Sequence, residues 1–592
     1  MATPRIIVVG GGLAGLAAVI KIAEAGGTVD LFSIVPVKRS HSVCAQGGIN
    51  AAKNLKGEGD TTAQHFDDTI YGGDFLANQT PVKAMCEAAP GIIDLLDRMG
   101  VPFNRTPEGL LDFRRFGGTL YNRTAFAGAT TGQQLLYALD EQVRRYESEG
   151  KVKKYEGWEF LSAVIDEQGV ARGIVAMDLR SMEVRAFSSG AMILATGGIG
   201  AIFGKSTNSV VCTGSAQSAV FQQGVYYANG EFIQVHPTSI PGEDKLRLMS
   251  ESARGEGGRV WVPRTPGDKR AAKSIPETER FYFLEEWYPK YGNLVPRDVA
   301  TRAIHKIVYE LGLGIDGQPM VYLDLTHIDR ATLDRKLGGI LEIYEKFVGV
   351  DPHVEPMKIF PGMHYTMGGL WVDFDQMTNV PGIFAAGECE YQYHGANRLG
   401  ANSLVSCIFG GFIAGPNAMK YAKSVAAAEG DGGAAREVAR QSEINQKLVN
   451  NQGGENPFKL WRELGSTMTE HATVIRYNRN LQQADGKIVE LLERYKRVNL
   501  SDKSQWANTS FAFARQLKNM LELSRTVVRG AILRDESRGA HYKPDFDERN
   551  DEKFLKTTKA TFTGCVEGPK LEFEAVDIQY IKPRPRRYDA AK

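Results

Sequence analysis

The sequence predicts an α/β protein. We expect a discontinuous Rossmann-like nucleotide-binding domain with an inserted α+β capping domain, followed by a helical domain and a small C-terminal domain. Three observations lead to this expectation. Three short apolar runs, RIIVV, AMILATGG and PGIFAAG, each end at a glycine turn. Long stretches separate the runs, as in a domain interrupted by an insertion. After about residue 420, Leu, Glu, Lys, Arg and Gln recur at helical spacing.

The first element is a strand at residues 5–9, followed by Gly10, Gly12 and Gly15 at GxGxxG spacing. The apolar segment LAGLAAVIKIAEAG then predicts a helix, and TVDLFS at 28–33 predicts a second strand. In this strand–turn–helix–strand order the glycines let the backbone approach a pyrophosphate at the helix N-terminus. The start of the chain therefore predicts a dinucleotide site.

The second strand departs from the usual pattern. An acidic residue commonly ends this strand and binds the adenosine ribose, but here the strand ends in Ser33. Asp30 lies inside the strand, which is a poor position for that contact. We expect Ser33, with Lys38 nearby, to substitute for it.

Later runs complete the nucleotide-binding domain. AMILATGGIG at 191–200 predicts a strand that returns beneath the dinucleotide, and PGIFAAGECE places Glu388 at a third strand end. We expect this domain to comprise residues 1–240 and 356–420, and the capping domain to comprise 241–355. Within the capping domain, the charged and proline-bearing stretch 263–280 predicts an exposed loop.

The C-terminal third of the sequence differs from the rest in composition and in residue spacing. VAAAEGDGGAA at 425–435 predicts a linker, and helices are expected in a domain at 435–540 that serves more as a scaffold than in chemistry. Residues 541–592 predict strands and turns. The final basic tail is expected to be solvated; its cations are Lys582, Arg584, Arg586 and Arg587.

Composition excludes several classes of function. Lys+Arg total 71 against 70 for Asp+Glu, so charge gives no case for a nucleic-acid partner. No apolar run reaches the roughly 18 residues of a membrane span, and the N-terminal residues lack a signal-peptide pattern. The six cysteines are scattered without a CxxC pair, so we expect reduced thiols and no metal or iron–sulfur site. A cytoplasmic protein is favoured.

The run RSHSVCAQGGIN at 39–50 follows the first βαβ unit and brings His41 to the region where the far end of a dinucleotide would lie. Together with GEGD and HFDDTIYGGDFL, it resembles the flavoprotein subunits of succinate dehydrogenase and fumarate reductase. In that family this histidine bonds covalently to the 8α-methyl of FAD. The resemblance therefore implies an 8α-histidyl FAD at His41.

Six further motifs occur in the family's order along almost the whole chain: QVHPT, SESARGEGG, LVPRDVATR, HYTMGGL, HGANRLGANSL and RDESRGAH. Besides the residues already named, the resemblance implies FAD contacts from Ser40, Gln46, Gly47, Gly48, Glu388, Ser403 and Leu404.

A small dianion such as succinate or fumarate needs cations or strong donors at both ends, and arginine matches a carboxylate with two donors. Arg398 and His364 resemble the family's clamp on one carboxylate, while His236 and Ser250 resemble the groups near the other. Most relatives have Thr where Ser250 stands, but the hydroxyl is kept.

The family's proton donor and acceptor is the arginine of the PRD motif, which is Arg297 here. Pro296 is a good first helical residue, so Arg297 should lie at a helix N-terminus, where the helix dipole disfavours a cation. Glu251 and Arg254 resemble the relay that exchanges the proton with bulk water. The alternative for Arg297 is a salt bridge to a neighbouring acidic loop.

The resemblance implies a respiratory enzyme that passes electrons to an iron–sulfur subunit and is held at the cytoplasmic side of the membrane through cytochrome b anchor subunits. The run YGGDFLANQ favours the di-haem, menaquinone-linked branch. Succinate oxidation and fumarate reduction use the same residues, so the sequence leaves the direction open. Two alternatives are a soluble aspartate oxidase, which His41 disfavours, and a non-catalytic FAD-binding scaffold, which would have no use for Arg297 and Arg398.

Overall fold

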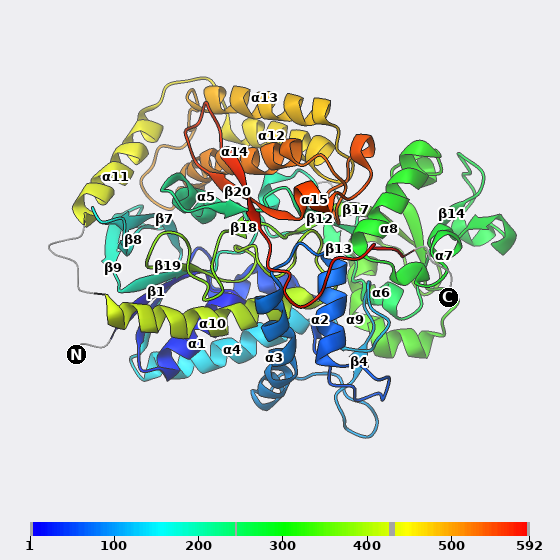
Figure 1. Cartoon of the computed structure of the whole chain (residues 1–592). Helices are drawn as coiled ribbons and strands as arrows, with labels where there is room; N and C mark the ends of the chain where they lie inside the picture. The colour runs from blue at the N-terminus through cyan, green and yellow to red at the C-terminus, as the bar shows by residue number, and fades with distance from the viewer. Residues whose placement is uncertain (1–3, 243–245, 426–432, 589–592) are drawn as a thin grey trace.

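The computed structural model describes residues 4–242, 246–425 and 433–588. Its central sheet is parallel and joins the three apolar runs as neighbours, as predicted (Figure 1). The strand order is β19 (Ile383–Ala385), β10 (Ala191–Leu194), β1 (Arg5–Val9), β2 (Thr28–Ser33) and β6 (Val152–Glu156).

Side chains of the central sheet alternate between two apolar layers, because successive residues of a strand point to opposite faces. Ile6 and Val8 belong to the layer of α1 (Leu13–Glu24), α4 (Thr131–Ser148) and α10 (Asn402–Ser424), which lie together below the sheet in Figure 1. Ile7 and Val9 face the antiparallel strands β7 (Trp158–Ile165), β8 (Ala171–Asp178) and β9 (Val184–Ser188). Both faces of the sheet are thus covered, as parallel sheets require.

The inserted segment forms an antiparallel sheet with helices against it, at the right of Figure 1. Its strands are β13 (Arg247–Leu248), β12 (Ile233–Ile240), β17 (Met357–Thr366), β16 (Val321–Asp324), β14 (Arg259–Pro263) and β15 (Arg280–Phe281), in that order. Strands β12 and β17 lie just outside the predicted range 241–355 yet pair with each other in this sheet. The predicted loop 263–280 is mostly exposed.

Three short helices and one long helix lie between these strands: α6 (Ser252–Gly255), α7 (Phe283–Trp287) and α8 (Arg297–His305) are short, and α9 (Arg330–Val348) has 19 residues. Pro296 is the cap of α8 and not its first residue, so α8 begins at Arg297, one position later than predicted. Arg297 therefore lies at the helix N-terminus.

Helices dominate the predicted helical segment, which confirms that expectation. They are α11 (Ala434–Asn450), α12 (Pro457–Ala472), α13 (Asn478–Tyr495) and α14 (Thr509–Leu533), and they lie along the top of Figure 1. Helix α14 packs against α5 (Ser215–Gln222), and the Trp461 indole donates to Ala201 O at 2.7 Å. The predicted linker at 425–435 falls largely outside the described residues.

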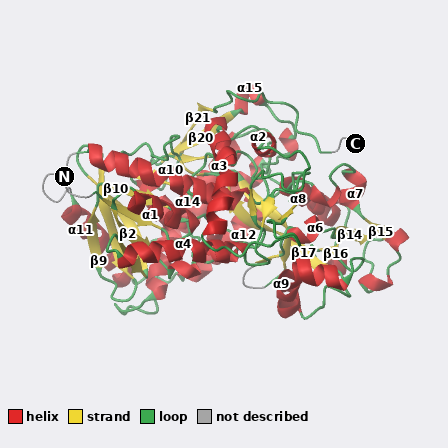
Figure 2. Cartoon of the chain, turned by 90° about the horizontal axis from the view of Figure 1, so that it is seen from below, coloured by secondary structure: helices red, strands yellow, loops and turns green. Residues whose placement is uncertain are grey.

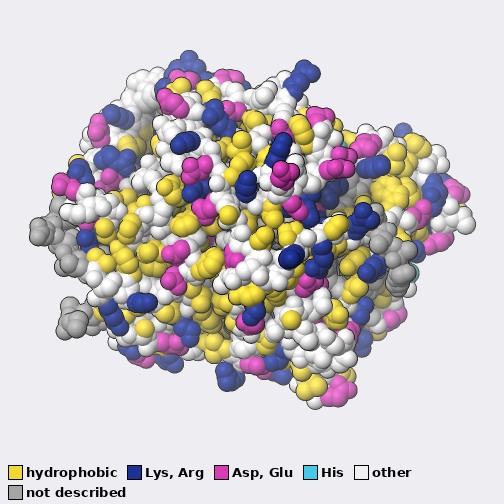
Figure 3. Space-filling model, in the orientation of Figure 1, with side chains coloured by type: hydrophobic (Ala, Val, Ile, Leu, Met, Phe, Trp, Pro, Cys, Tyr) yellow, Lys and Arg dark blue, Asp and Glu magenta, His cyan; other side chains and the backbone are white. Residues whose placement is uncertain are grey.

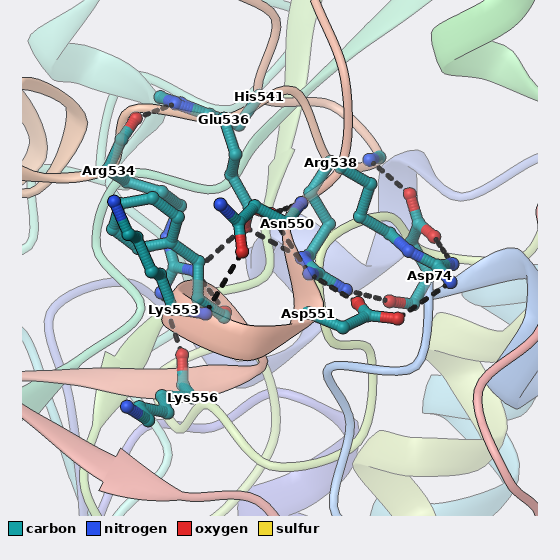
Figure 4. A network of polar contacts seen from close by, with 12 residues as sticks. Asp74, Arg534, Glu536, Arg538, His541, Asn550, Asp551, Lys553 and Lys556 are labelled. Atoms are coloured by element: carbon teal, nitrogen blue, oxygen red, sulfur yellow. Dashed lines mark hydrogen bonds and ion pairs between the residues drawn. The ribbon is translucent and has the colours of Figure 1, made fainter. Parts of the chain in front are cut away.

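The motif RDESRGAH forms a buried ionic network (Figure 4). Arg534 pairs with Glu231 and Glu536, and Arg538 pairs with Glu536 and donates to the backbone oxygen of Asp74. The pairs Arg534–Glu231 and Arg538–Glu536 are completely buried, so removing one partner would leave an uncompensated charge. The network ties the C-terminal part to residues far earlier in the chain, next to α15 (Asp551–Phe554), β20 (Lys556–Thr561) and β21 (Lys570–Ala575).

The basic tail is not simply solvated: that prediction was wrong for Arg586, whereas Arg584 stays exposed although it forms an ion pair. Arg586 is buried against Asp298 with two hydrogen bonds of 2.6 and 3.0 Å. Arg584 pairs with Asp67 in α2 (Thr62–Gly72). Lys582 and Arg587 are exposed as expected. Figure 1 shows the described part of the tail crossing α2 toward the inserted domain, whose elements α7, α8 and β14 lie together at the right of Figure 2.

Basic and acidic side chains are interspersed over the face of the molecule in Figure 3, in keeping with the near balance of charge. Among the residues that the structure describes, no helix is both long and apolar enough to span a bilayer. The same residues contain no cluster of His, Cys, Asp or Glu that could hold a metal ion.

Candidate active site

One cavity of about 530 Å³ runs from the glycine turn after β1 to the inserted domain. Residues of both parts of the nucleotide-binding domain line it, as do residues of the capping region. All the predicted site residues lie in its wall except three: Gly15, Lys38 and Arg254.

The glycine turn is as tight as the predicted motif requires. Gly10 has φ +116°, and a Cβ there would lie 2.1 Å from Ala195 O. Gly12 caps α1 and lines the cavity. A Cβ on Gly15 would lie 1.9 Å from Gly10 O, so Gly15 allows α1 to pack on the turn and does not face the cavity. The N-terminus of α1 is thereby open to an anion.

Ser33 and Lys38 have different surroundings. Ser33 lines the cavity and donates to Val35 O at 2.6 Å. Lys38 is held against α4, where its Nζ lies 3.7 Å from Asp140 and 4.9 Å from the ring centre of Tyr137. The buried carboxylate and the aromatic ring hold the Lys38 ammonium toward α4, and its contact with the ribose stays a prediction.

His41 begins the short helix η2 (His41–Cys44) and lines the cavity. Its Nδ1 accepts the backbone N–H of Ser209 at 3.2 Å. The next loop continues the wall with Gln46, Gly47 and Gly48, and the Arg114 guanidinium donates to Gly47 O at 3.1 Å. The hydrogen bond from Arg114 thus holds this loop in place.

The wall fits a polar dinucleotide such as FAD. Buried polar atoms on it have no hydrogen-bond partner within the described part of the chain, including Ser40 Oγ, Gln46 Oε1 and Thr196 Oγ1. Unpaired buried polar atoms are costly unless a ligand or water satisfies them. Together with the glycine turn, they match the hydroxyl, phosphate and ring-edge groups of such a ligand.

Glu388, Ser403 and Leu404 lie on the opposite side of the cavity. Glu388 Oε1 accepts the backbone N–H of Thr366 at 3.0 Å. Burial outweighs that hydrogen bond and raises the pKa of Glu388 to about 7. Ser403 and Leu404 belong to the first turn of α10.

Two histidines and an arginine converge at the capping end of the cavity. The rings of His236 and His364 lie 4.9 Å apart between centres, and His364 Nδ1 is 2.7 Å from Thr207 Oγ1. Burial, followed by the nearby Arg297, lowers the pKa of both imidazoles well below the usual value, so both are neutral. His236 Nε2 and Arg398 Nε are buried without a partner among the described residues.

Arg398 stacks over Tyr365, with 4.4 Å between the guanidinium carbon and the ring centre. Burial, and next the charge of Arg297, lowers the pKa of Arg398 to about 9, which leaves it a cation at neutral pH. Ser250 is buried with its hydroxyl 2.8 Å from that of Ser252. Two arginines, two neutral imidazoles and a hydroxyl therefore line the same pocket.

Arg297 and Arg254 share one carboxylate. Arg297 Nε donates to Glu251 Oε2 at 2.8 Å, and Arg254 Nη2 donates to Glu251 Oε1 at 3.0 Å. Burial would raise the pKa of Glu251, but the two guanidinium groups hold it below its ordinary value. Arg254 lies behind Glu251, away from the cavity wall, and continues to Asn293 O at 2.7 Å. The three side chains form a continuous hydrogen-bonded row.

Two residues of the site were not predicted from the sequence. Gln234 accepts from Arg297 at 3.0 Å and donates to Arg398 O at 2.8 Å, so it links the two arginines. Phe116 is buried in the wall beside Gly47. Gln234 begins the QVHPT motif and so stood inside a segment already singled out, whereas Phe116 precedes the glycine pair of RRFGGT, outside the motifs named above.

Comparison with known proteins agrees with this geometry. A model described as an FAD binding domain matches residues 5–404, and one described as fumarate reductase flavoprotein C-term matches residues 461–588. The succinate dehydrogenase flavoprotein subunit of Bacillus subtilis is 62% identical over 100% of both chains. The chain belongs to the succinate dehydrogenase and fumarate reductase flavoprotein family. It is therefore an FAD-dependent oxidoreductase, as the resemblance implied.

Other members of the family are less identical in sequence but also match over almost the full length of both chains. The fumarate reductase flavoprotein subunit of Escherichia coli is 35% identical over 98% of this chain and 95% of its own. A solved Escherichia coli quinol fumarate reductase flavoprotein superposes with a TM-score of 0.91 at 32% identity, covering 100% of both chains. Mycobacterium smegmatis Sdh1 gives a TM-score of 0.82 at 29% identity, over 99% of this chain and 96% of that one. The fold of these relatives is thus the fold of this chain.

Proposed function

We propose that the capping end of the cavity binds succinate or fumarate between two sets of donors. Arg398 and His364 would hold one carboxylate, and His236 and Ser250 the other. The support is electrostatic: the two arginine side chains and the neutral imidazoles offer N–H donors, and two of these nitrogens are buried without a partner within the described chain. A dianion supplies acceptors for such donors.

Arg297 is the proposed proton donor and acceptor, and the hydrogen-bonded row Arg297–Glu251–Arg254 supports this proposal. During succinate oxidation, Arg297 accepts a proton from one methylene as it releases its own guanidinium proton to Glu251, which passes it toward Arg254; fumarate reduction reverses the path. FAD, when bound, accepts the hydride from the other methylene or returns it. Glu251 also keeps the positive charge of Arg297 compensated while the substrate is absent.

FAD is proposed to be attached covalently through His41. The backbone N–H of Ser209 engages Nδ1, so Nε2 is the nitrogen that we assign to the bond with the 8α carbon. An imidazole substituted at Nε2 keeps the Nδ1 lone pair, and this lone pair still accepts the Ser209 N–H. Contacts to the rest of FAD fall to Gly10, Gly12, Ser33, Ser40, Gln46, Gly47, Gly48, Glu388, Ser403 and Leu404.

Electrons are proposed to leave through an iron–sulfur subunit and then through di-haem cytochrome b anchor subunits to a quinone. The relatives are named subunits, and one solved relative is a quinol-fumarate reductase with menaquinol molecules. On this proposal the chain sits at the cytoplasmic side of the membrane, peripherally, through its partners.

Purification of the tagged chain from native membranes tests the proposal. Succinate- and fumarate-dependent turnover are assayed on the same preparation, and co-purifying subunits are identified with their haem and iron content. Acid precipitation should leave yellow colour in the denatured protein. A preparation without dicarboxylate turnover would overturn the substrate assignment, and a colourless pellet would overturn the covalent link.

A further inference from the structure

The tail residues 584–588 bridge the two lobes that form the cavity. Arg584 pairs with Asp67 of α2 and lies over the Tyr71 ring, 5.0 Å from its centre. The Tyr71 hydroxyl accepts the N–H of Arg587 at 2.6 Å and donates to its carbonyl at 3.0 Å. Asp67 and Tyr71 of α2, in the nucleotide-binding domain, therefore hold the tail at Arg584 and Arg587.

The other end of the tail is buried in the inserted domain. Tyr588 is 5% exposed and contacts Tyr71 and Tyr291, with ring centres 5.5 and 5.1 Å apart. The Tyr588 ring thus stands between the domains, because Tyr71 comes from α2 and Tyr291 from the segment before α8. Arg586 lies over the same ring, 4.9 Å from its centre.

Arg586 is a counter-ion of the Asp298 carboxylate, and Asp298 directly follows Arg297 in the first turn of α8. Both Arg586 Nη atoms donate to Asp298, one to each oxygen, and the side chains of the pair are 7% and 1% exposed. Arg302 approaches the same carboxylate at 3.3 Å and donates to Gly539 O at 2.7 Å. Asp298 is thus held between one arginine of its own helix and one from the tail.

Asp298 needs this partner because it is buried. Burial would raise its pKa, yet the charges of Arg586 and then Arg302 bring it down to about 2, so the carboxylate is ionised at neutral pH. Without Arg586, a buried anion would lose its bidentate cation, and the start of α8 would relax toward solvent. The side chain that would move with it is Arg297, whose aim at Glu251 depends on the same turn.

We propose that residues 584–588 form a strap that fastens the inserted domain to the nucleotide-binding domain, and that Arg586 is a positioning residue for Arg297. This inference rests on the proton-transfer role proposed above. Catalytic groups misplaced by about 1 Å lose on the order of 100-fold in rate, so a strap that fixes one turn of α8 acts on turnover without touching the substrate.

The test compares Arg586→Ala, Arg586→Lys and Arg587→Ala in the complete membrane complex. Arg587→Ala is the matched control, because it removes the same charge from the adjacent, exposed position. We expect Arg586→Ala to lower kcat for succinate oxidation about tenfold or more, with KM within about threefold and FAD content unchanged. Arg586→Lys keeps one donor and the charge, and should recover part of the loss. Arg587→Ala should match the parent.

Two further measurements distinguish a positioning role of Arg586 from a purely stabilising one. The solvent deuterium isotope effect on kcat should rise in Arg586→Ala, since proton transfer becomes slower. Asp298→Asn should lower kcat similarly, and the double variant should be no worse than either single one. A lower melting temperature with parental kcat and isotope effect in Arg586→Ala or Arg586→Lys would overturn the inference. If Arg297→Ala itself kept turnover, the proton-transfer proposal would fail instead.

Discussion

Arg297 and Glu251 form an ion pair with 2.7 Å between Nη2 and Oε2, and their side chains are 5% and 0% exposed. The same carboxylate accepts from Arg254 and from the backbone N–H of Gly117. Two cations around one buried anion leave a net positive charge facing the cavity, which favours a dianionic substrate. Removing one member of such a pair costs roughly 3–5 kcal/mol of stability, so every variant here needs a folding control.

Arg297→Ala should lower turnover in both directions by about 10³-fold or more, the scale of a lost acid–base group. FAD content and melting curve identify variants that fold. Arg264→Ala, in the exposed loop of the inserted domain, is the control. Near-normal turnover in folded Arg297→Ala would remove the proton-transfer assignment.

Arg398→Ala should raise KM for succinate by roughly 10- to 100-fold, because a charge-assisted hydrogen bond contributes about 1.5–3 kcal/mol. Arg398→Lys should recover only part of this, since an ammonium cannot match a carboxylate with two parallel donors. Steady-state kinetics with succinate, and with malonate as a competing dicarboxylate, measure the effect. An unchanged KM in both variants would contradict the clamp.

His41→Ser should leave FAD bound without a covalent bond, with succinate oxidation lost and some fumarate reduction kept. The attached flavin has the higher reduction potential, and succinate is a weak electron donor. Acid precipitation, followed by measurement of flavin fluorescence in the pellet and in the supernatant, shows whether FAD is covalently attached to the protein. Unimpaired succinate oxidation with all flavin in the supernatant would show that attachment is dispensable.

Gly15→Ala should prevent close packing of α1 on the glycine turn, because the new methyl would lie 1.9 Å from Gly10 O. We expect low soluble yield and loss of FAD. Gly91→Ala is the matched control: it lies inside α3 (Gln79–Arg98), and a Cβ there meets nothing within 4 Å. That control should gain up to about 1 kcal/mol from helix propensity. Equal FAD retention in the two variants would argue against the tight turn.

His65 gives a prediction for pH. It is completely buried, with Nε2 2.9 Å from Asn402 Oδ1, and burial, with the charge of Arg123 second, lowers its pKa from 6.5 to about 3. The unfolded chain takes up a proton below pH 6.5 while the folded chain stays neutral. The contribution of neutral His65 is therefore complete above pH 6.5 and is lost as pH falls toward 3, by about 1.4 kcal/mol per unit.

His65→Gln should accordingly flatten the fall of the melting temperature between pH 6.5 and 5 relative to the parent. Glutamine can still donate to Asn402 Oδ1, so the contact itself is kept. His327→Gln, at an exposed position, is the matched control substitution. The same profile for His65→Gln and the parent would show that this imidazole is not the group responsible.

Local patterns were sufficient to predict β19, β10, β1 and β2 of the central sheet but not the edge strand β6. Residues 5–9, 191–194 and 383–385 are short apolar runs before glycine turns, and such turns bring strand ends to one edge of a sheet. His41 was placed near the cavity by its position after the first βαβ unit, whereas the place of Arg297 in the same cavity was implied by the resemblance to the family. Their chemical roles stay predictions.

The features that sequence patterns did not predict depend on distant partners. Lys38 turns toward Asp140, about a hundred residues away, and Arg586 is buried only because Asp298 receives it. Gln234 connects two arginines that lie far apart in the chain. None of these pairings leaves a periodic or spacing signal, since each is created by the tertiary fold.

Because Arg586 follows Asp298 by 288 residues, the contact between them can form only after this long intervening segment has been synthesised. A nascent or prematurely terminated chain would therefore carry the glycine turn and His41 but lack the final support of α8.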